Sequence, residues 1–194
     1  MKAGNQATDE MGHLWLQLLP RGAGDHRRTI EEALMRHRLE KYPDDFSAHL
    51  NLGAILLSRL DMQGAAGMLE TAVRLNPNSP EAHDMLGSAL RNLGRQREAI
   101  AQFRLALKAQ PEYVNARYDL ALALAKSGNF PEAIANLQQV VAAFPNNARL
   151  HNQLGTLLAH EGQPSEALAQ FNRALALDPS NEDARKNRDI VLKQ

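Results

Sequence analysis

The sequence predicts an all-α protein in which antiparallel helix pairs stack into a solenoid. The first observation is a pattern of 34 residues that recurs four times in the 194-residue chain. The second is that each copy contains two apolar stripes with α-helical spacing, and the third is a proline that follows each second stripe. A fixed period of this length is typical of stacked helical units, because one unit alone cannot bury its apolar faces.

Seven columns of residues keep the same phase in the four repeats. Each column holds one residue type or a few similar ones. The columns are Leu52, Leu86, Leu120 and Leu154; Gly53, Gly87, Ala121 and Gly155; Leu56, Leu90, Leu124 and Leu158; Ala65, Ala99, Ala133 and Ala167; Leu69, Phe103, Leu137 and Phe171; Ala72, Ala106, Val140 and Ala174; and Pro77, Pro111, Pro145 and Pro179. Small residues in these columns predict that two helix backbones approach closely, with large side chains around the contact.

The second repeat shows why each unit is expected to form a helical hairpin. Ser79 can cap a helix that begins at Pro80, and Gly94 can end it. A second apolar stripe runs through Phe103, and Pro111 prevents this helix from continuing. The unit is therefore predicted to be two helices joined by a short turn.

The first repeat departs from this pattern. Leu60 stands where the other repeats have Gly94, Gly128 and Gly162 between their helices, and Gly67 lies inside the second helix. Glycine inside a helix costs about 1 kcal/mol relative to alanine. We therefore expect the first repeat to be the least stable of the four.

These columns resemble the tetratricopeptide repeat, a 34-residue helical hairpin whose copies stack into a right-handed superhelix. The resemblance covers residues 46–181, which are 136 of the 194 residues. The early aromatic of the family pattern is replaced by His49, His83, Arg117 and His151. We expect the histidines to pack between helices rather than to bind zinc, because they lie in different layers and zinc needs nitrogens about 2 Å from one point.

Both ends of the chain differ from the repeats. Thr29 and Glu32 have the spacing of a capping box at the start of a helix, and Trp15, Leu18 and Pro43 continue the 34-residue register backwards. The last helix has a narrow apolar strip and a charged remainder, as a terminal cap requires. The expected segments are a disordered 1–12, a degenerate hairpin that caps the N-terminus at 13–45, repeats at 46–79, 80–113, 114–147 and 148–181, and a C-terminal capping helix at 182–194.

The composition argues against several functions. The chain has 22 basic and 22 acidic side chains, and zero net charge disfavours binding to duplex nucleic acid or to anionic membranes. The absence of cysteine excludes disulfides, thiolate-bound zinc and a cysteine nucleophile. The sequence has no apolar run long enough to cross a membrane and no recognisable signal peptide, so we expect a cytoplasmic location.

No catalytic, metal or cofactor motif stands out in the sequence. His160 and Glu161 are followed by Gly162, which ends the helix that a zinc motif would need, and no strand precedes the glycines at 22–24. The basic cluster at 26–38 could bind phosphate or an acidic peptide, but interleaved glutamates favour a solvated helix face. We therefore expect no enzyme activity, no cofactor and no metal.

The resemblance implies that the first helix of each repeat lines a concave groove that receives a peptide or a partner helix. The candidate contacts are the residues of these helices that lie off the packing stripe. They are Leu50, Asn51, Ala54 and Leu57; Asp84, Met85, Ser88 and Arg91; Asn115, Tyr118, Asp119 and Leu122; and Arg149, Asn152, Gln153, Thr156 and His160. Amides in this set can both donate to and accept from a peptide backbone. Leu50 and Leu122 could equally pack against the next repeat.

Two ligand classes of the family are not expected. The clamp that cochaperones use for the C-terminal carboxylate of heat-shock chaperones needs Lys, Asn, Asn, Lys and Arg. The matching positions hold Leu50, Ala54, Met85, Asn115 and Asp119, or, one repeat later, Asp84, Ser88, Asp119, Arg149 and Gln153. The asparagine ladder of sugar-transferring relatives is also missing, because its column reads Asn51, Met85, Asp119 and Gln153.

The sequence thus predicts a non-catalytic adaptor that binds a peptide or a partner protein. One alternative is self-assembly into a homo-oligomer through the weakly capped N-terminus and its Leu14-Trp15-Leu16 run. Another is an accessory region of a larger enzyme.

Overall fold

The computed structural model describes residues 24–193, and its secondary structure there consists of helices joined by short turns. The predicted disordered segment at 1–12 and the first part of the predicted N-terminal hairpin lie outside the described residues. The helices are α2 (Gly24–Lys41), α3 (Phe46–Ser58), α4 (Met62–Leu75), α5 (Pro80–Asn92), α6 (Gln96–Ala109), α7 (Val114–Lys126), α8 (Phe130–Ala143), α9 (Ala148–His160), α10 (Pro164–Leu177) and α11 (Glu182–Val191). The predicted fold class, an all-α solenoid of stacked helix pairs, is confirmed.

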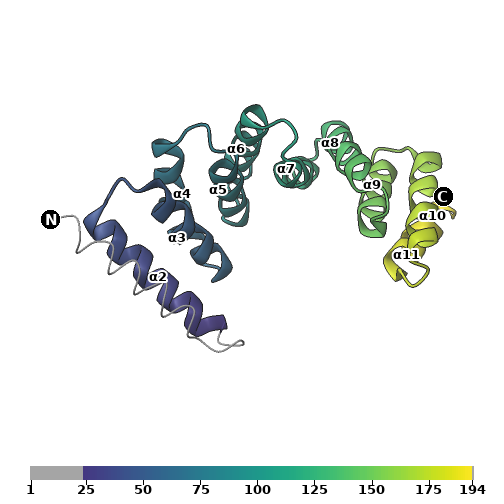
Figure 1. Cartoon of the computed structure of the whole chain (residues 1–194). Helices are drawn as coiled ribbons and strands as arrows, with labels where there is room; N and C mark the ends of the chain where they lie inside the picture. The colour runs from purple at the N-terminus through teal and green to yellow at the C-terminus, as the bar shows by residue number, and fades with distance from the viewer. Residues whose placement is uncertain (1–23, 194) are drawn as a thin grey trace.

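The helices form an arch, with α2 at one end and α11 at the other (Figure 1). The first helices of the four pairs, α3, α5, α7 and α9, lie toward the inner side of the arch, and α4, α6, α8 and α10 lie toward the outer side. Each first helix packs most closely on the second helix of its own pair, and each second helix then packs on the next pair. The 34-residue period therefore becomes a repeated two-layer packing.

Close contact between the two helices of a repeat depends on the column of small residues, Gly53, Gly87, Ala121 and Gly155. A Cβ atom built on Gly87 would lie 2.6 Å from Phe103 Cε1, and one built on Gly155 would lie 2.7 Å from Phe171 Cε1. Phe103 is fully buried and Phe171 is almost so. The aromatic ring thus occupies the space that a side chain on the first helix would take, which explains why glycine and phenylalanine occur together.

The turns inside the repeats require a left-handed backbone. Gly94, Gly128 and Gly162 have φ values of 78°, 81° and 74° at this point. Leu60 takes the same position in the first repeat with φ 62°, although left-handed backbone costs a residue with a Cβ roughly 1–2 kcal/mol. The tertiary arrangement therefore imposes the turn on a residue that does not favour it.

The column that lacks the family aromatic fastens each repeat to the loop before it. The Nε2 atoms of His49, His83 and His151 lie 2.8, 2.9 and 3.0 Å from the carbonyl oxygens of prolines six residues earlier. A carbonyl only accepts, so each Nε2 donates. The three rings are buried. The expected packing between helices is thus accompanied by a hydrogen bond that a phenyl ring could not make.

The N-terminal end differs from one expectation. Thr29 was predicted to cap a helix, but α2 begins at Gly24 and runs through it. The Thr29 hydroxyl instead accepts a hydrogen bond from Arg59 Nη2 at 2.9 Å, and Arg59 also pairs with Glu32. Thr29 and Glu32, the two residues of the predicted capping box, therefore join α2 to the end of α3. A capping pattern covers only neighbouring residues, so it could not predict this contact.

Candidate partner-binding groove

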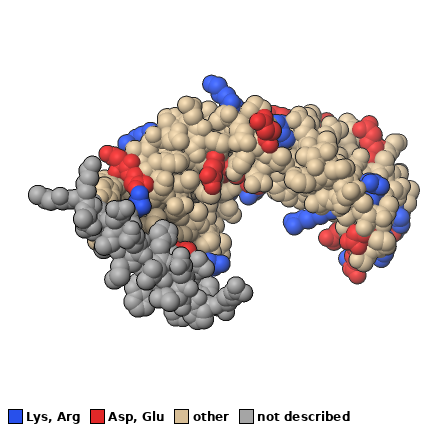
Figure 2. Space-filling model, in the orientation of Figure 1, with Lys and Arg blue, Asp and Glu red and all other residues tan. Residues whose placement is uncertain are grey.

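The inner side of the arch encloses an open hollow between its two ends (Figure 2). Lys, Arg, Asp and Glu are scattered over the visible face, with no large area of one sign. All of the candidate contact residues predicted from the sequence lie on α3, α5, α7 and α9, the helices nearest this hollow. We call the surface of these four helices that faces the hollow the concave surface.

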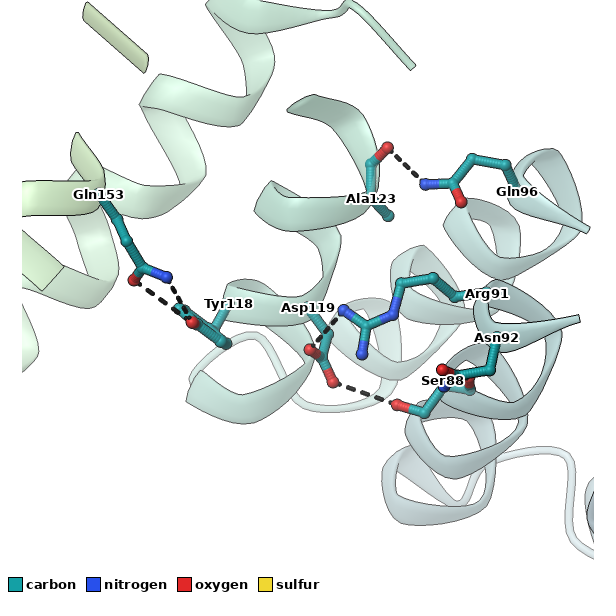
Figure 3. Close-up of polar contacts among 8 residues, drawn as sticks. All are labelled: Ser88, Arg91, Asn92, Gln96, Tyr118, Asp119, Ala123 and Gln153. Carbon is teal, nitrogen blue, oxygen red and sulfur yellow. Dashed lines mark hydrogen bonds and ion pairs between the residues drawn. The ribbon is translucent and has the colours of Figure 1, made fainter. Parts of the chain in front are cut away.

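Several candidate residues bind each other across the joint between the second and third repeats (Figure 3). Arg91 Nη1 of α5 donates to Asp119 Oδ1 of α7 at 3.0 Å, and Ser88 Oγ donates to Asp119 Oδ2 at 3.2 Å. Both oxygens of Asp119 therefore have partners inside the chain, and its charge is balanced by Arg91.

The joint between the third and fourth repeats has a similar bond. Gln153 Nε2 of α9 donates to the Tyr118 hydroxyl of α7 at 2.9 Å (Figure 3). Tyr118 is only partly exposed. Its hydroxyl thus connects two repeats, while its ring also lines a pocket described below.

The same row of polar contacts continues to the C-terminal helix. Asn187 Nδ2 of α11 donates to Asn152 Oδ1 at 3.1 Å and to Thr156 Oγ1 at 3.3 Å. Asn187 is missing from the predicted set, although it lies 34 residues after Gln153 and so continues that column. Extending the period past Pro179 would have identified it.

The apolar candidates divide between the core and the surface. Leu50 is buried in the core, so its side chain serves packing rather than the groove surface. Leu57 and Met85 are half-buried and pack against the core, and Leu122 is also half-buried. Asn51 is exposed, and Ala54 is intermediate.

A pocket of about 330 Å³ lies where α7, α8 and α9 meet. Four of the predicted residues line it: Asn115, Tyr118, Arg149 and Gln153. Its remaining lining consists of Val114, Val140, Phe144, Asn147 and Leu150. Phe144, 52% exposed, ends the second helix of the third repeat, a position that the first-helix pattern could not indicate.

The polar groups of this α7–α9 pocket are available to a ligand. Arg149 is exposed and forms no ion pair with any described residue. Asn115 is exposed as well. The pocket thus combines one cation without an ion pair among the described residues, side-chain amides and two aromatic rings, which suits a peptide segment with mixed apolar and polar side chains.

A second pocket, of about 220 Å³, lies between α9, α10 and α11. Its walls include Thr156, His160, Phe171 and Ile190. The His160 ring stacks on Phe130, with ring centroids 5.4 Å apart and planes at 4°. This stacking gives His160 a structural partner on α8.

Asp84 is the buried carboxyl of the concave surface, 9% exposed. Burial, followed by the nearby charge of Asp119, raises its pKa from 3.8 to about 7, although Arg91 acts in the opposite direction. Asp84 Oδ1 has no hydrogen-bond partner among the described residues. Asp84 therefore ionises near neutral pH rather than near pH 4.

Residues 24–193 contain no group of three or more His, Cys, Asp or Glu side chains placed to hold a metal ion. Within the same part of the chain, every helix is too short or too polar to cross a membrane.

Comparison with known proteins agrees with the repeat architecture. The Tetratricopeptide repeat family profile matches residues 27–80, 56–114, 85–135 and 118–182. No match was found among the curated proteins.

Solved structures show the same fold. YrrB, described as a TPR protein with an unusual peptide-binding site, is 26% identical with a TM-score of 0.75, and the match covers 82% of each chain. MamA is 24% identical with a TM-score of 0.74, over 84% of this chain and 99% of MamA. TTC0263, a thermophilic TPR protein of Thermus thermophilus, is 22% identical with a TM-score of 0.60, over 95% and 97% of the two chains. With its repeated hairpins matched over most of its length, the chain belongs to the tetratricopeptide repeat family.

Proposed function

We propose that this chain is a non-catalytic adaptor whose concave surface binds a segment of a partner protein. The observation that carries the proposal is the α7–α9 pocket, where exposed polar side chains and aromatic rings meet at the joint between two repeats. A peptide-binding site described for YrrB, a structure of the same fold, supports the same use of the surface.

The pocket suggests how a segment would be held. Arg149 can donate to a carboxylate or to backbone carbonyls, and the Asn115 amide can both donate and accept. Phe144 and Tyr118 provide apolar area for one partner side chain. The remaining candidates on α3 and α5 would extend the contact toward the N-terminal end of the arch.

The test needs variants that change the pocket without loosening the solenoid. Tyr118 bonds to Gln153 across a repeat joint and also lines the pocket, so Tyr118→Ala would disturb both the joint and the pocket. Asn115→Ala with Arg149→Ala removes two exposed side chains and leaves that joint intact. A matched control is Arg97→Ala with Asn172→Ala, since both residues are exposed on outer helices, α6 and α10.

Affinity capture from a lysate of the source organism compares the unaltered chain with both double variants. We expect a partner that is retained by the unaltered chain and by the outer-helix control and is lost with the pocket variant. Equal retention by all three, with unchanged circular dichroism, would place binding elsewhere and contradict the proposal.

Self-assembly is the second candidate, and the C-terminal helix favours it. Ile190 of α11 and Leu192 just after it are 57% and 62% exposed, which leaves apolar surface open to a second copy. Sedimentation velocity over a wide concentration range tests this candidate. A mass that rises with concentration and returns to that of the monomer in Ile190→Asp supports it, and a constant monomer mass excludes it.

A further inference from the structure

Asp84 has a feature that the packing of the repeats does not explain. It lies on the side of α5 that faces α7, since Tyr113, just before α7, and Asp119, within α7, both act on its carboxyl. The residue is only 9% exposed, yet Oδ1 has no partner among the described residues. A buried carboxylate without full compensation costs free energy, so proteins normally pair such a group with a cation.

The surroundings of Asp84 are short of positive charge. Glu81 on α5 and Asp119 on α7 both act on it as like charges, and Arg91 is the cation among its main influences. Arg91 donates to Asp119 at 3.0 Å, so its hydrogen bonding is committed to the other carboxylate. Asp84 and Asp119 thus share one guanidinium at the α5–α7 joint, and Glu81 adds a further negative charge that acts on Asp84.

The other helices packed on α5 do not supply the missing charge. Helix α3 contains no Asp, Glu, Lys or Arg. The ionisable residues of α4 and α6 are not among the main influences on Asp84; they are Glu70, Arg74, Arg97, Glu98, Arg104 and Lys108. On α7, Arg117 donates to the Pro111 carbonyl, and neither Arg117 nor Lys126 is among the main influences on Asp84. None of these described residues compensates Asp84 fully, and a bound partner can supply the cation.

We propose that the partner segment places a Lys or Arg side chain against Asp84 at the α5–α7 joint of the concave surface. This inference rests on the proposed function, because it assigns one residue of the segment bound there. The cation donates to the carboxyl from the groove. Glu81, exposed in the preceding turn of α5, adds attraction for the same charge. An acidic residue at this place would be repelled.

The probe is a phage-displayed library of random 12-residue peptides, selected at pH 8 against the full chain and against Asp84→Asn. We expect peptides selected by the unaltered chain to share a Lys or Arg at one aligned position, and peptides selected by Asp84→Asn to lack it. Glu166→Gln, which removes one exposed carboxylate on α10, is the matched control and should select the same peptides as the unaltered chain.

Fluorescence anisotropy then measures one selected peptide and its Lys→Met counterpart. We expect the unaltered chain to bind the Met peptide about tenfold more weakly than the Lys peptide, because an interaction that shifts a pKa by one unit changes affinity about tenfold. For Asp84→Asn the two peptides should differ by less than about twofold. Binding of the Lys peptide should strengthen up to about tenfold from pH 6 to pH 8, because Asp84 ionises over this range. The Met peptide and the Asp84→Asn chain should lack this pH dependence.

The outcomes separate the two proposals. If no peptide is enriched, the proposed function fails and this inference fails with it. Enriched peptides that no longer bind the Asn115→Ala, Arg149→Ala variant show that binding takes place in the groove. If these peptides share no Lys or Arg, or if peptides selected by Asp84→Asn share the same one, groove binding stands and the role of Asp84 is overturned. The peptide substitution does not depend on how well the protein variant folds.

Discussion

At the scale of single residues, Leu60 and Asp84 both occupy positions that oppose their own preferences. Leu60 has a left-handed backbone at a turn where three other repeats use glycine. Asp84 is a buried carboxyl beside two other carboxylates. Neither is required by the local helix, so each is a place where a single substitution should change stability in a predictable direction.

Leu60→Gly should stabilise the chain by about 1 kcal/mol, since it relieves the left-handed strain at the cost of some extra freedom in the unfolded state. The Leu60 side chain is 78% exposed, so little packing is lost. Urea unfolding followed by circular dichroism measures the change. Leu60→Ala is the control, because it keeps the Cβ atom and should show no such gain; an equal gain would contradict the backbone explanation.

Asp84→Asn should change how stability depends on pH. The folded-state pKa of about 7 is higher than the ordinary value of 3.8, so the folded chain binds more protons than the unfolded chain between these values. The stability contributed by the protonated carboxyl is complete below about pH 4 and is lost as the pH rises through 7. The loss is on the order of 2–4 kcal/mol.

Unfolding free energies at pH 5 and pH 8 test this sign. We expect the unaltered chain to lose stability relative to Asp84→Asn as the pH rises. Parallel curves for the two proteins would show that Asp84 titrates normally in the folded chain.

At the scale of helices and their contacts, the columns of the sequence correspond closely to packing. The alanines of the second helices, Ala65, Ala99, Ala133 and Ala167, are completely buried. The start of α2 could not be found in the same way, because Thr29 bonds to Arg59, 30 residues away. A capping pattern describes only neighbouring residues, whereas this hydroxyl is used in a contact between helices.

Gly87→Ala should destabilise the chain by roughly 1–3 kcal/mol, because the new Cβ would overlap the buried Phe103 ring. The third repeat has Ala121 and Leu137 at the same positions, and both are fully buried. Combining Gly87→Ala with Phe103→Leu should therefore cost less than the sum of the two single changes. Urea or thermal unfolding of the unaltered chain, the two single variants and the double variant measures this double-mutant cycle. Strictly additive changes in unfolding free energy would contradict the overlap of the Cβ atom with the ring.

At the scale of the whole molecule, the inner side of the arch serves both cohesion and, as proposed, binding. Asp119 joins the second and third repeats, and Asn187 joins the last repeat to α11. Asn115 and Arg149 remain exposed in the α7–α9 pocket. The partner is thus expected to contact residues between the bonds that hold the repeats together.

Asp119→Ala should weaken the joint between the second and third repeats by about 1–3 kcal/mol, since Arg91 is 25% exposed and loses its carboxylate. In a solenoid, weakening one joint reduces the coupling of the repeats on its two sides. Hydrogen exchange should then show α3–α6 opening at lower free energy than α8–α10. Uniform protection of all repeats would contradict a localised joint.

The sequence by itself determined the fold class and the helices of the four repeats, because a 34-residue period repeats the same local choices of cap, stripe and stop. The resemblance to the tetratricopeptide repeat also implied that the first helices line the hollow, as they do in the structure. Only the tertiary structure decided which of their side chains are engaged across repeat joints, such as Ser88 and Asp119, and that Phe144 of a second helix lines the α7–α9 pocket. The physical reason is that these contacts join residues about one repeat apart, and their geometry depends on how the hairpins stack rather than on the order of residues within any one of them.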